Sequence, residues 1–291
     1  MTSMIRKTAW SALLALALVS VGWAGPGQGS GQQQQQPQTP PKPPSQPTQP
    51  GQTAPAQPEA PPLPVNKAEE DAYKTLFETK DNAERKIQLG EDFLKKFPQS
   101  RYLESVYSQL TAAYLAAGQV DRMFAAGEKA IELRPDDMDV LSLLAWVMPR
   151  RIGASTLDAD QKLDKAEKYG KQAITLLVAM QKPAMLTDED FTKAKNEKLS
   201  MCHSGLGVVY FHRQRYADSA AELEQATKLS TTPDPTDYYV LGLAYMNAKR
   251  YGDAAGAFGQ CAAAPTPLQD PCKQDLAGAK KLAATQLAPP K

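Results

Sequence analysis

One stretch of this chain occurs as two similar copies that lie 35 residues apart in the sequence. Each copy holds a Leu-Gly pair, then a tyrosine, then a second aromatic residue and a small residue. A fixed period of this size is typical of helix pairs that stack into a solenoid, because one pair alone has no partner for its apolar face. The matched positions are Leu206-Gly207 with Leu241-Gly242, Tyr210 with Tyr245, Tyr216 with Tyr251, and Ala226 with Cys261.

These residues resemble the tetratricopeptide repeat, in which a Leu-Gly pair is followed three residues later by tyrosine, and then by an aromatic residue and an alanine. The physical roles agree with the resemblance. Glycine lets two helices approach closely, tyrosine fills the space between them, and the small residues pack against the next pair. The resemblance implies an all-α solenoid of helix pairs that binds protein partners.

The predicted solenoid covers residues 65–287 and comprises four or five helix pairs and a C-terminal capping helix. Tyr107 and Tyr114 mark an earlier unit, and residues 66–99 form a degenerate one. The period is interrupted between residues 149 and 187. There the sequence predicts a loop, a long second helix, and a next first helix that begins at Asp188 and is about three turns longer than usual.

Two segments precede the solenoid. Residues 1–24 have a basic start at Arg6 and Lys7, an apolar run and small residues around Trp23, which together predict a secretory signal peptide cleaved before Gly25. The run is shorter than the ~20 residues that a membrane span needs, so we expect no span in the mature chain. An uncleaved N-terminal anchor is the alternative. The predicted localisation is the periplasm or cell envelope.

Residues 25–64 are rich in proline and glutamine and contain 13 of the 24 prolines. Such a composition has almost nothing to bury and predicts a disordered linker. The linker acts either as a spacer or as a tether that contacts the cell envelope.

No catalytic set is found in the sequence. There are two histidines, His203 and His212, and neither stands near a nucleophile signature; we expect His203 to pack between helices. The three cysteines and two histidines have no metal-ligand spacing. The net charge of +1 argues against nucleic-acid binding. We therefore expect no enzyme activity, no cofactor and no metal. We interpret Arg150 and Arg151 as part of a solvated loop, with an anion site as the alternative.

The cysteines suggest one disulfide bond. Cys261 ends the last repeat and Cys272 begins the terminal helix 11 residues later. An exported protein meets an oxidising compartment, where this pair can be joined. Cys202 would then be a buried free thiol. Three packed thiols are the alternative.

The resemblance also predicts a binding groove. In proteins of this kind the first helix of each pair lines a concave groove, and here its lining is apolar and aromatic, which disfavours a clamp for a carboxylate. We expect a non-catalytic scaffold whose groove takes an apolar or amphipathic segment of a protein or peptide partner. Part of the groove could instead be covered by the long helix or the terminal helix. Earlier in the array Ser108, Ala112, Leu115 and Ser142 face the groove. The remaining groove residues are Trp146, Ser204, Val208, Phe211, His212, Tyr239, Leu243, Met246 and Asn247.

Overall fold

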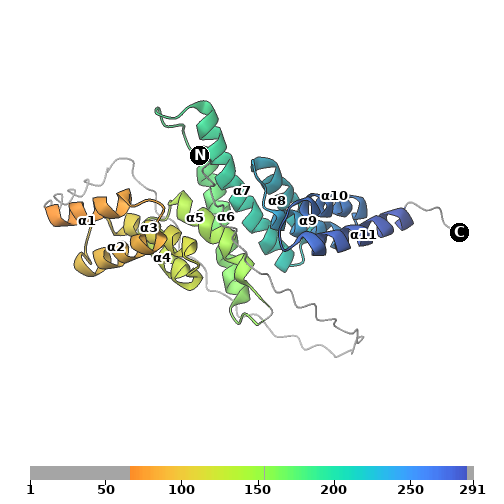
Figure 1. Cartoon of the computed structure of the whole chain (residues 1–291), viewed down its shortest axis with the longest axis horizontal. Helices are drawn as coiled ribbons and strands as arrows, with labels where there is room; N and C mark the ends of the chain where they lie inside the picture. Colours follow the sequence, from red (N-terminus) through yellow and green to blue (C-terminus); the bar gives the residue numbers. More distant parts are fainter. Residues whose placement is uncertain (1–65, 154, 287–291) are drawn as a thin grey trace, which may run out of the picture. The chain divides into compact units, whose positions relative to one another are not determined.

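Helices pair in sequence along the chain in the computed structural model, which describes residues 66–153 and 155–286. These residues form eleven α-helices and no strand (Figure 1). The predicted signal peptide and the predicted linker lie outside the described residues. The all-α, repeat-type solenoid is confirmed.

Five pairs are followed by one terminal helix. The first three pairs are α1 (Lys67–Glu78) with α2 (Ala83–Lys96), α3 (Leu103–Ala116) with α4 (Val120–Leu133), and α5 (Met138–Val147) with α6 (Ala159–Ala179). The last two pairs are α7 (Asp188–His212) with α8 (Tyr216–Leu229) and α9 (Pro235–Asn247) with α10 (Tyr251–Ala263); α11 (Gln269–Gln286) packs on α10.

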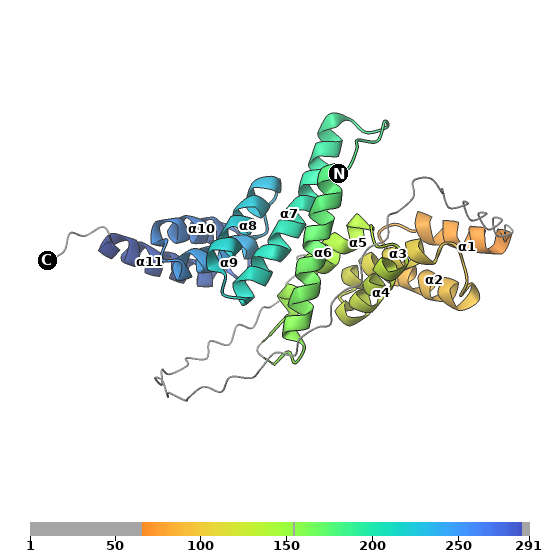
Figure 2. The ribbon, with the colours of Figure 1, turned by 180° about the vertical axis from the view of Figure 1, so that it is seen from behind.

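The predicted interruption falls between α5 and α7. After α5 a single 3-10 turn, Pro149–Arg151, leads into a loop, and α6 and α7 are 21 and 25 residues long. These two long helices lie side by side in both views (Figures 1 and 2). Thr187 caps α7 by accepting a hydrogen bond from the Asp190 N–H, so the lengthened helix begins where the sequence predicts.

Helix crossings are close where glycine stands on the first helix. A Cβ added at Gly205 would lie 2.3 Å from the carbonyl oxygen of Ala145 on α5. A Cβ at Gly207 or Gly242 would instead meet a side chain of the second helix, Leu223 or Phe258 respectively. The Leu-Gly signature of the sequence is therefore a packing requirement, because any side chain there would occupy space that the neighbouring helix fills.

A three-residue polar tie recurs between successive pairs. The Tyr114 hydroxyl on α3 donates to Glu91 on α2 at 3.0 Å, and the Arg122 guanidinium from α4 lies 4.4 Å from the centre of the Tyr114 ring. Burial and the Glu91 carboxylate raise the pKa of Tyr114 to about 12, so its hydroxyl remains a donor. The same arrangement appears as Tyr210 with Glu167 and Arg215, and as Tyr245 with Glu224 and Arg250.

The buried apolar side chains form two separate clusters. The first runs from Leu76 on α1 to Tyr210 on α7. The second lies in α8 to α11 and is centred on Leu223, Tyr245 and Phe258. The division falls inside the α7–α8 pair rather than between pairs.

Candidate partner-binding groove

A pocket of about 500 Å³ opens on the first helices of four successive pairs. Its walls come from α1, α3, α5 and α7, together with the turn that precedes α5. Small side chains on α3 and α5, including Ser108, Ala112 and Ser142, leave the space open. The lining residues are Phe77, Ser105, Ser108, Gln109, Ala112, Arg134, Asp137, Asp139, Val140, Ser142, Leu143, Lys198 and Met201.

Asp137 lines the pocket and caps α5. One carboxylate oxygen accepts hydrogen bonds from the Asp139 and Val140 N–H groups at 3.1 and 3.2 Å, and the other accepts from Ser108 and Arg134. Burial raises the pKa of the Asp137 carboxyl, but these donors outweigh it and hold the pKa below its ordinary value. The Asp137 carboxylate is therefore charged, and both of its oxygens already accept hydrogen bonds from the protein itself.

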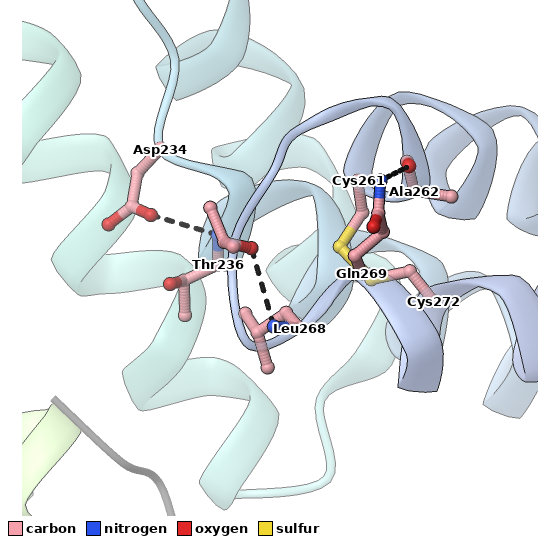
Figure 3. The surroundings of a disulfide bond; sticks show 8 residues. Asp234, Thr236, Cys261, Ala262, Leu268, Gln269 and Cys272 are labelled. Carbon is pink, nitrogen blue, oxygen red and sulfur yellow. Dashed lines mark hydrogen bonds between the residues drawn. A yellow bond between two sulfur atoms is a disulfide. The ribbon is translucent and has the colours of Figure 1, made fainter. Parts of the chain in front are cut away.

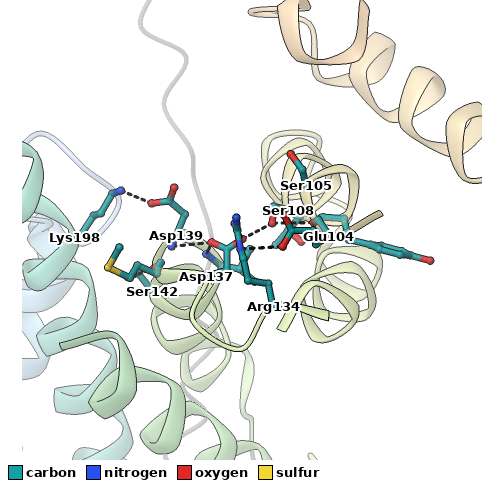
Figure 4. Close-up of polar contacts among 12 residues, drawn as sticks. Glu104, Ser105, Ser108, Arg134, Asp137, Asp139, Ser142 and Lys198 are labelled. Carbon is teal, nitrogen blue, oxygen red and sulfur yellow. Dashed lines mark hydrogen bonds and ion pairs between the residues drawn. The ribbon is translucent and has the colours of Figure 1, made fainter. Parts of the chain in front are cut away.

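The charged side chains around the pocket are matched within the protein (Figure 4). Arg134 pairs with Asp137 and lies 3.4 Å from Glu104, and Lys198 from α7 pairs with Asp139 from α5. The hydrogen bond to Asp137 raises the pKa of Arg134. Because these pairs already neutralise one another, a strongly charged ligand would have to break existing ion pairs.

Apolar groups supply the remaining surface of the pocket. Phe77 on α1 is 57% exposed, although it is a large hydrophobic residue, and Leu143 and Met201 are half-buried. Exposed apolar surface in a concavity is typical of a binding site. The pocket therefore suits an uncharged segment with apolar side chains.

The predicted groove residues on α5, α7 and α9 divide by exposure. Trp146, Phe211, Tyr239, Leu243 and Met246 are half-buried, and His212 and Asn247 are exposed. Ser204 and Val208 are buried instead, at 1% and 6% exposure, and neither is among the residues that line the pocket. Their position on a first helix would face a groove in a regular array, but here the inserted turn and α9 pack against α7 at this level.

Helices near the C-terminal end cover part of the predicted groove lining. The ring of Tyr239 lies 6.0 Å from that of Phe258 on α10. Burial raises the pKa of Tyr239, and the Asp275 carboxylate on α11 adds to the increase. Phe211 has an edge contact with Tyr216 at 5.7 Å. The more open surface therefore lies at the pocket on α1, α3, α5 and α7.

Arg150 is not solvated, and the loop interpretation of this residue is wrong. Its side chain is 11% exposed and forms an ion pair with Asp237 of α9 at 2.7 Å. It also donates to Ser204 of α7 and to the Trp146 carbonyl, the latter at 2.7 Å, and its guanidinium lies 5.0 Å from the centre of the Trp146 ring. Arg151 is exposed.

Several pocket residues were not predicted from the sequence. Phe77 stands in the degenerate first unit, and Lys198 and Met201 lie in the lengthened helix, where counting from the repeat signature has no reference. Gln109 is adjacent to the predicted Ser108, whereas Arg134 follows α4 and lies near no predicted position in the sequence. A helical-face count extended to α1 and to the start of α7 could have found Phe77 and Met201.

The two histidines and Cys202 serve packing contacts. His203 Nδ1 lies 2.6 Å from Glu222 on α8, and His212 Nε2 lies 3.0 Å from the Pro149 carbonyl. Burial raises the pKa of the Cys202 thiol to about 11, which keeps it protonated and unreactive. Among the described residues no three His, Cys, Asp or Glu side chains are grouped to hold a metal ion.

Cys261 and Cys272, the pair proposed from the sequence, are joined by a disulfide bond between α10 and α11 (Figure 3). Their Cα atoms are 5.9 Å apart. Gln269 adds a hydrogen bond from its side-chain amide to the Ala262 carbonyl at 3.2 Å. The terminal helix is thus fixed to the last pair by a covalent bond and by polar contacts. In the described part of the chain, no helix has the length and apolar character that crossing a membrane requires.

No protein-family model matches the chain, and no curated protein matches it. Solved structures do. PilW, a widely conserved type IV pilus biogenesis factor, has 14% identity and a TM-score of 0.51 over 76% of this chain and 89% of its own. A thermophilic tetratricopeptide repeat protein of Thermus thermophilus has 18% identity and a TM-score of 0.43 over 76% of this chain and all of its own. Yeast Tom70 has 14% identity and a TM-score of 0.44 over 75% of this chain and 39% of its own.

At 14% identity the likeness to PilW concerns the fold, and it agrees with the repeat signature in the sequence and with the five helix pairs. The chain has the fold of a tetratricopeptide-repeat solenoid.

Proposed function

We propose that this protein is an exported, non-catalytic scaffold that holds an uncharged apolar or amphipathic segment of a partner protein in the pocket on its first helices. The observation that carries the proposal is the pocket itself, which four successive first helices build from small, hydroxyl and apolar side chains. Its charges are paired within the protein, so apolar contacts and hydrogen bonds supply the affinity. Phe77 and Met201 are the apolar anchors.

Site-specific photo-crosslinking tests the pocket. Ala112 lines the pocket on α3 and is exposed, and Ala125 is an exposed alanine on the second helix α4. A photoreactive phenylalanine at Ala112 should crosslink the full chain to a partner in the native organism, and the same residue at Ala125 should not. Equal crosslinking at both positions would contradict the pocket assignment.

Affinity measurements then test the anchors. With the crosslinked partner identified, Phe77→Ala should weaken binding by about 1–2 kcal/mol, as expected for an interface anchor. Leu133→Ala is the matched control, because Leu133 is 49% exposed and lies on the second helix α4. Phe77→Ala should disturb the fold less than truncation of Tyr239, because Phe77 is 57% exposed whereas Tyr239 is half-buried.

Export is tested separately. N-terminal sequencing of the protein from the envelope fraction should begin at Gly25, and recovery of Met1 or Thr2 would indicate a retained anchor. Deletion of residues 25–64 distinguishes the scaffold from the tether alternative. A scaffold keeps its partner without the proline-rich segment, whereas a tether loses its localisation.

A further inference from the structure

The interface between α7 and the helices that follow it is unusually polar. Seven polar side chains are buried among the described residues, and four of them lie here: Ser200, Ser204, Ser219 and Asp237. Ser200 donates to the Ala226 carbonyl and Ser219 donates to the Gly207 carbonyl, both at 2.8 Å. This polar seam lies where the two apolar clusters adjoin, and Leu223 of α8 packs on Gly207 of α7 within it.

Further polar contacts run along the same seam. His203 faces Glu222 at 2.6 Å, and Glu197 accepts hydrogen bonds from Ser230 Oγ and from the Thr231 N–H at 3.0 and 2.9 Å. Hydrogen bonds of this kind set the position of two surfaces accurately. They add little net free energy, because the same groups are hydrogen-bonded to water when the surfaces separate.

The ion pair of Arg150 and Asp237 is the charged contact of the seam. Asp237 Oδ1 accepts from Arg150 at 2.7 Å and from Ser204 at 2.5 Å. These three residues come from the inserted turn, α7 and α9, so the contact joins both sides of the seam. Arg150 Nε is buried and has no hydrogen-bond partner among the described residues. A buried pair that is incompletely satisfied contributes less to stability than well-packed apolar residues of the same volume.

From these observations we propose that the array consists of two bodies, α1–α7 and α8–α11, which separate reversibly along the polar seam and are latched by Arg150 and Asp237. Most members of each apolar cluster lie within one body, although Phe211 of α7 packs on the second cluster and Leu229 of α8 packs on the first. The disulfide bond between Cys261 and Cys272 lies within the second body and survives the opening. Arg150 also lies over the ring of Trp146. A predicted groove residue is therefore in contact with the Arg150–Asp237 ion pair.

Native-state hydrogen exchange on the full chain tests the proposal. After separation α8–α11 lose the contacts with α7 that help to stabilise them, so their helices unfold more readily and their amides should share one opening reaction that is distinct from that of α1–α6. Asp237→Asn removes the charge with little change of shape and leaves Arg150 unpaired, so exchange in α8–α11 should accelerate about tenfold or more while α1–α6 are unchanged. Asp218→Asn on α8 is the matched control, because Asp218 forms an exposed pair with Arg215 at 2.7 Å.

If Asp237→Asn does not fold, a milder variant can be used for the same test. Ser204→Ala removes the hydroxyl that donates to Asp237, and it should accelerate exchange several-fold in the same helices only. Equal acceleration in α1–α6 and α8–α11 would show a single cooperative body and overturn the proposal. No acceleration with either variant would show that the Arg150–Asp237 contact is not a latch, and would equally overturn it.

Discussion

The crossing of α5 and α7 allows one substitution to be worked through from geometry. A Cβ on Gly205 would lie 2.3 Å from the carbonyl oxygen and 2.7 Å from the carbonyl carbon of Ala145. A relaxed contact between carbon and a carbonyl oxygen is about 3.3 Å, so Gly205→Ala must separate the two helices by about 1 Å. The obstructing atoms are helix backbone and have no rotamer that would relieve the contact.

The expected change in the free energy of unfolding for Gly205→Ala follows from two opposing effects. Overpacking costs about 1–3 kcal/mol, and the rigid backbone contact here favours the upper end. Replacing glycine by alanine inside a helix returns about 1 kcal/mol of propensity. The net expected loss for Gly205→Ala is therefore about 2 kcal/mol.

Gly256→Ala in α10 is the control with the same chemistry, because a Cβ there meets nothing within 4 Å. This variant should gain about 1 kcal/mol from propensity alone. Equilibrium unfolding in urea, followed by far-UV circular dichroism on the full chain, measures both. With a slope of about 2 kcal/mol per molar urea, the midpoint should fall by about 1 M for Gly205→Ala and rise by about 0.5 M for Gly256→Ala. A midpoint for Gly205→Ala at or above that of the wild type would refute the reasoning.

Three further predictions follow from local geometry. Lys249 has a left-handed backbone, with φ 59°, at the turn where Gly118 stands in an earlier pair, so Lys249→Gly should stabilise the protein by about 1 kcal/mol in the same urea assay; a loss of stability would argue against strain there. Because the pKa of Asp137 is lowered in the folded protein, its carboxylate makes its full contribution to the free energy of unfolding at neutral pH. This contribution is lost as the pH falls through the lowered pKa. Asp137→Ala should accordingly cost about 1–2 kcal/mol at pH 7 and less in acid, and a pH-independent difference would exclude the charged role. Reduction of the disulfide in the purified protein should lower stability by about 2–3 kcal/mol, and Cys261→Ser should be insensitive to reductant; peptide mapping that finds three free thiols would contradict both statements.

The features of the fold that could be predicted from the sequence are those that depend on residues close together in the chain. The period, the cap at Thr187 and the position of Pro235 depend on neighbouring residues, so the helix pairs and the long α7 were predicted. The polar seam was not. Arg150 follows a proline in an irregular segment and looks solvated, and its burial depends on Asp237, which lies 87 residues later.

The candidate site shows the same division. Counting along first helices identified Ser108, Ala112 and Ser142, which do line the pocket. The count placed Ser204 and Val208 in the groove because it assumed regular spacing between pairs, whereas the insertion brings additional elements onto that face. The pocket volume depends on the distances between four helices, and those distances are not encoded in any one segment.

The recurrent tyrosine tie has no counterpart on the last helix pair. Each second helix supplies a glutamate eight residues after its first residue: Glu91 in α2, Glu128 in α4, Glu167 in α6 and Glu224 in α8. The following pair supplies the cationic partner, which for Glu128 is Lys165 at 2.7 Å. In α10 this place is taken by Gly259, where even a Cβ would meet open space. A sixth pair grafted after α10 would find no carboxylate at this place to receive its tyrosine, so forming a tie there would first require Gly259→Glu.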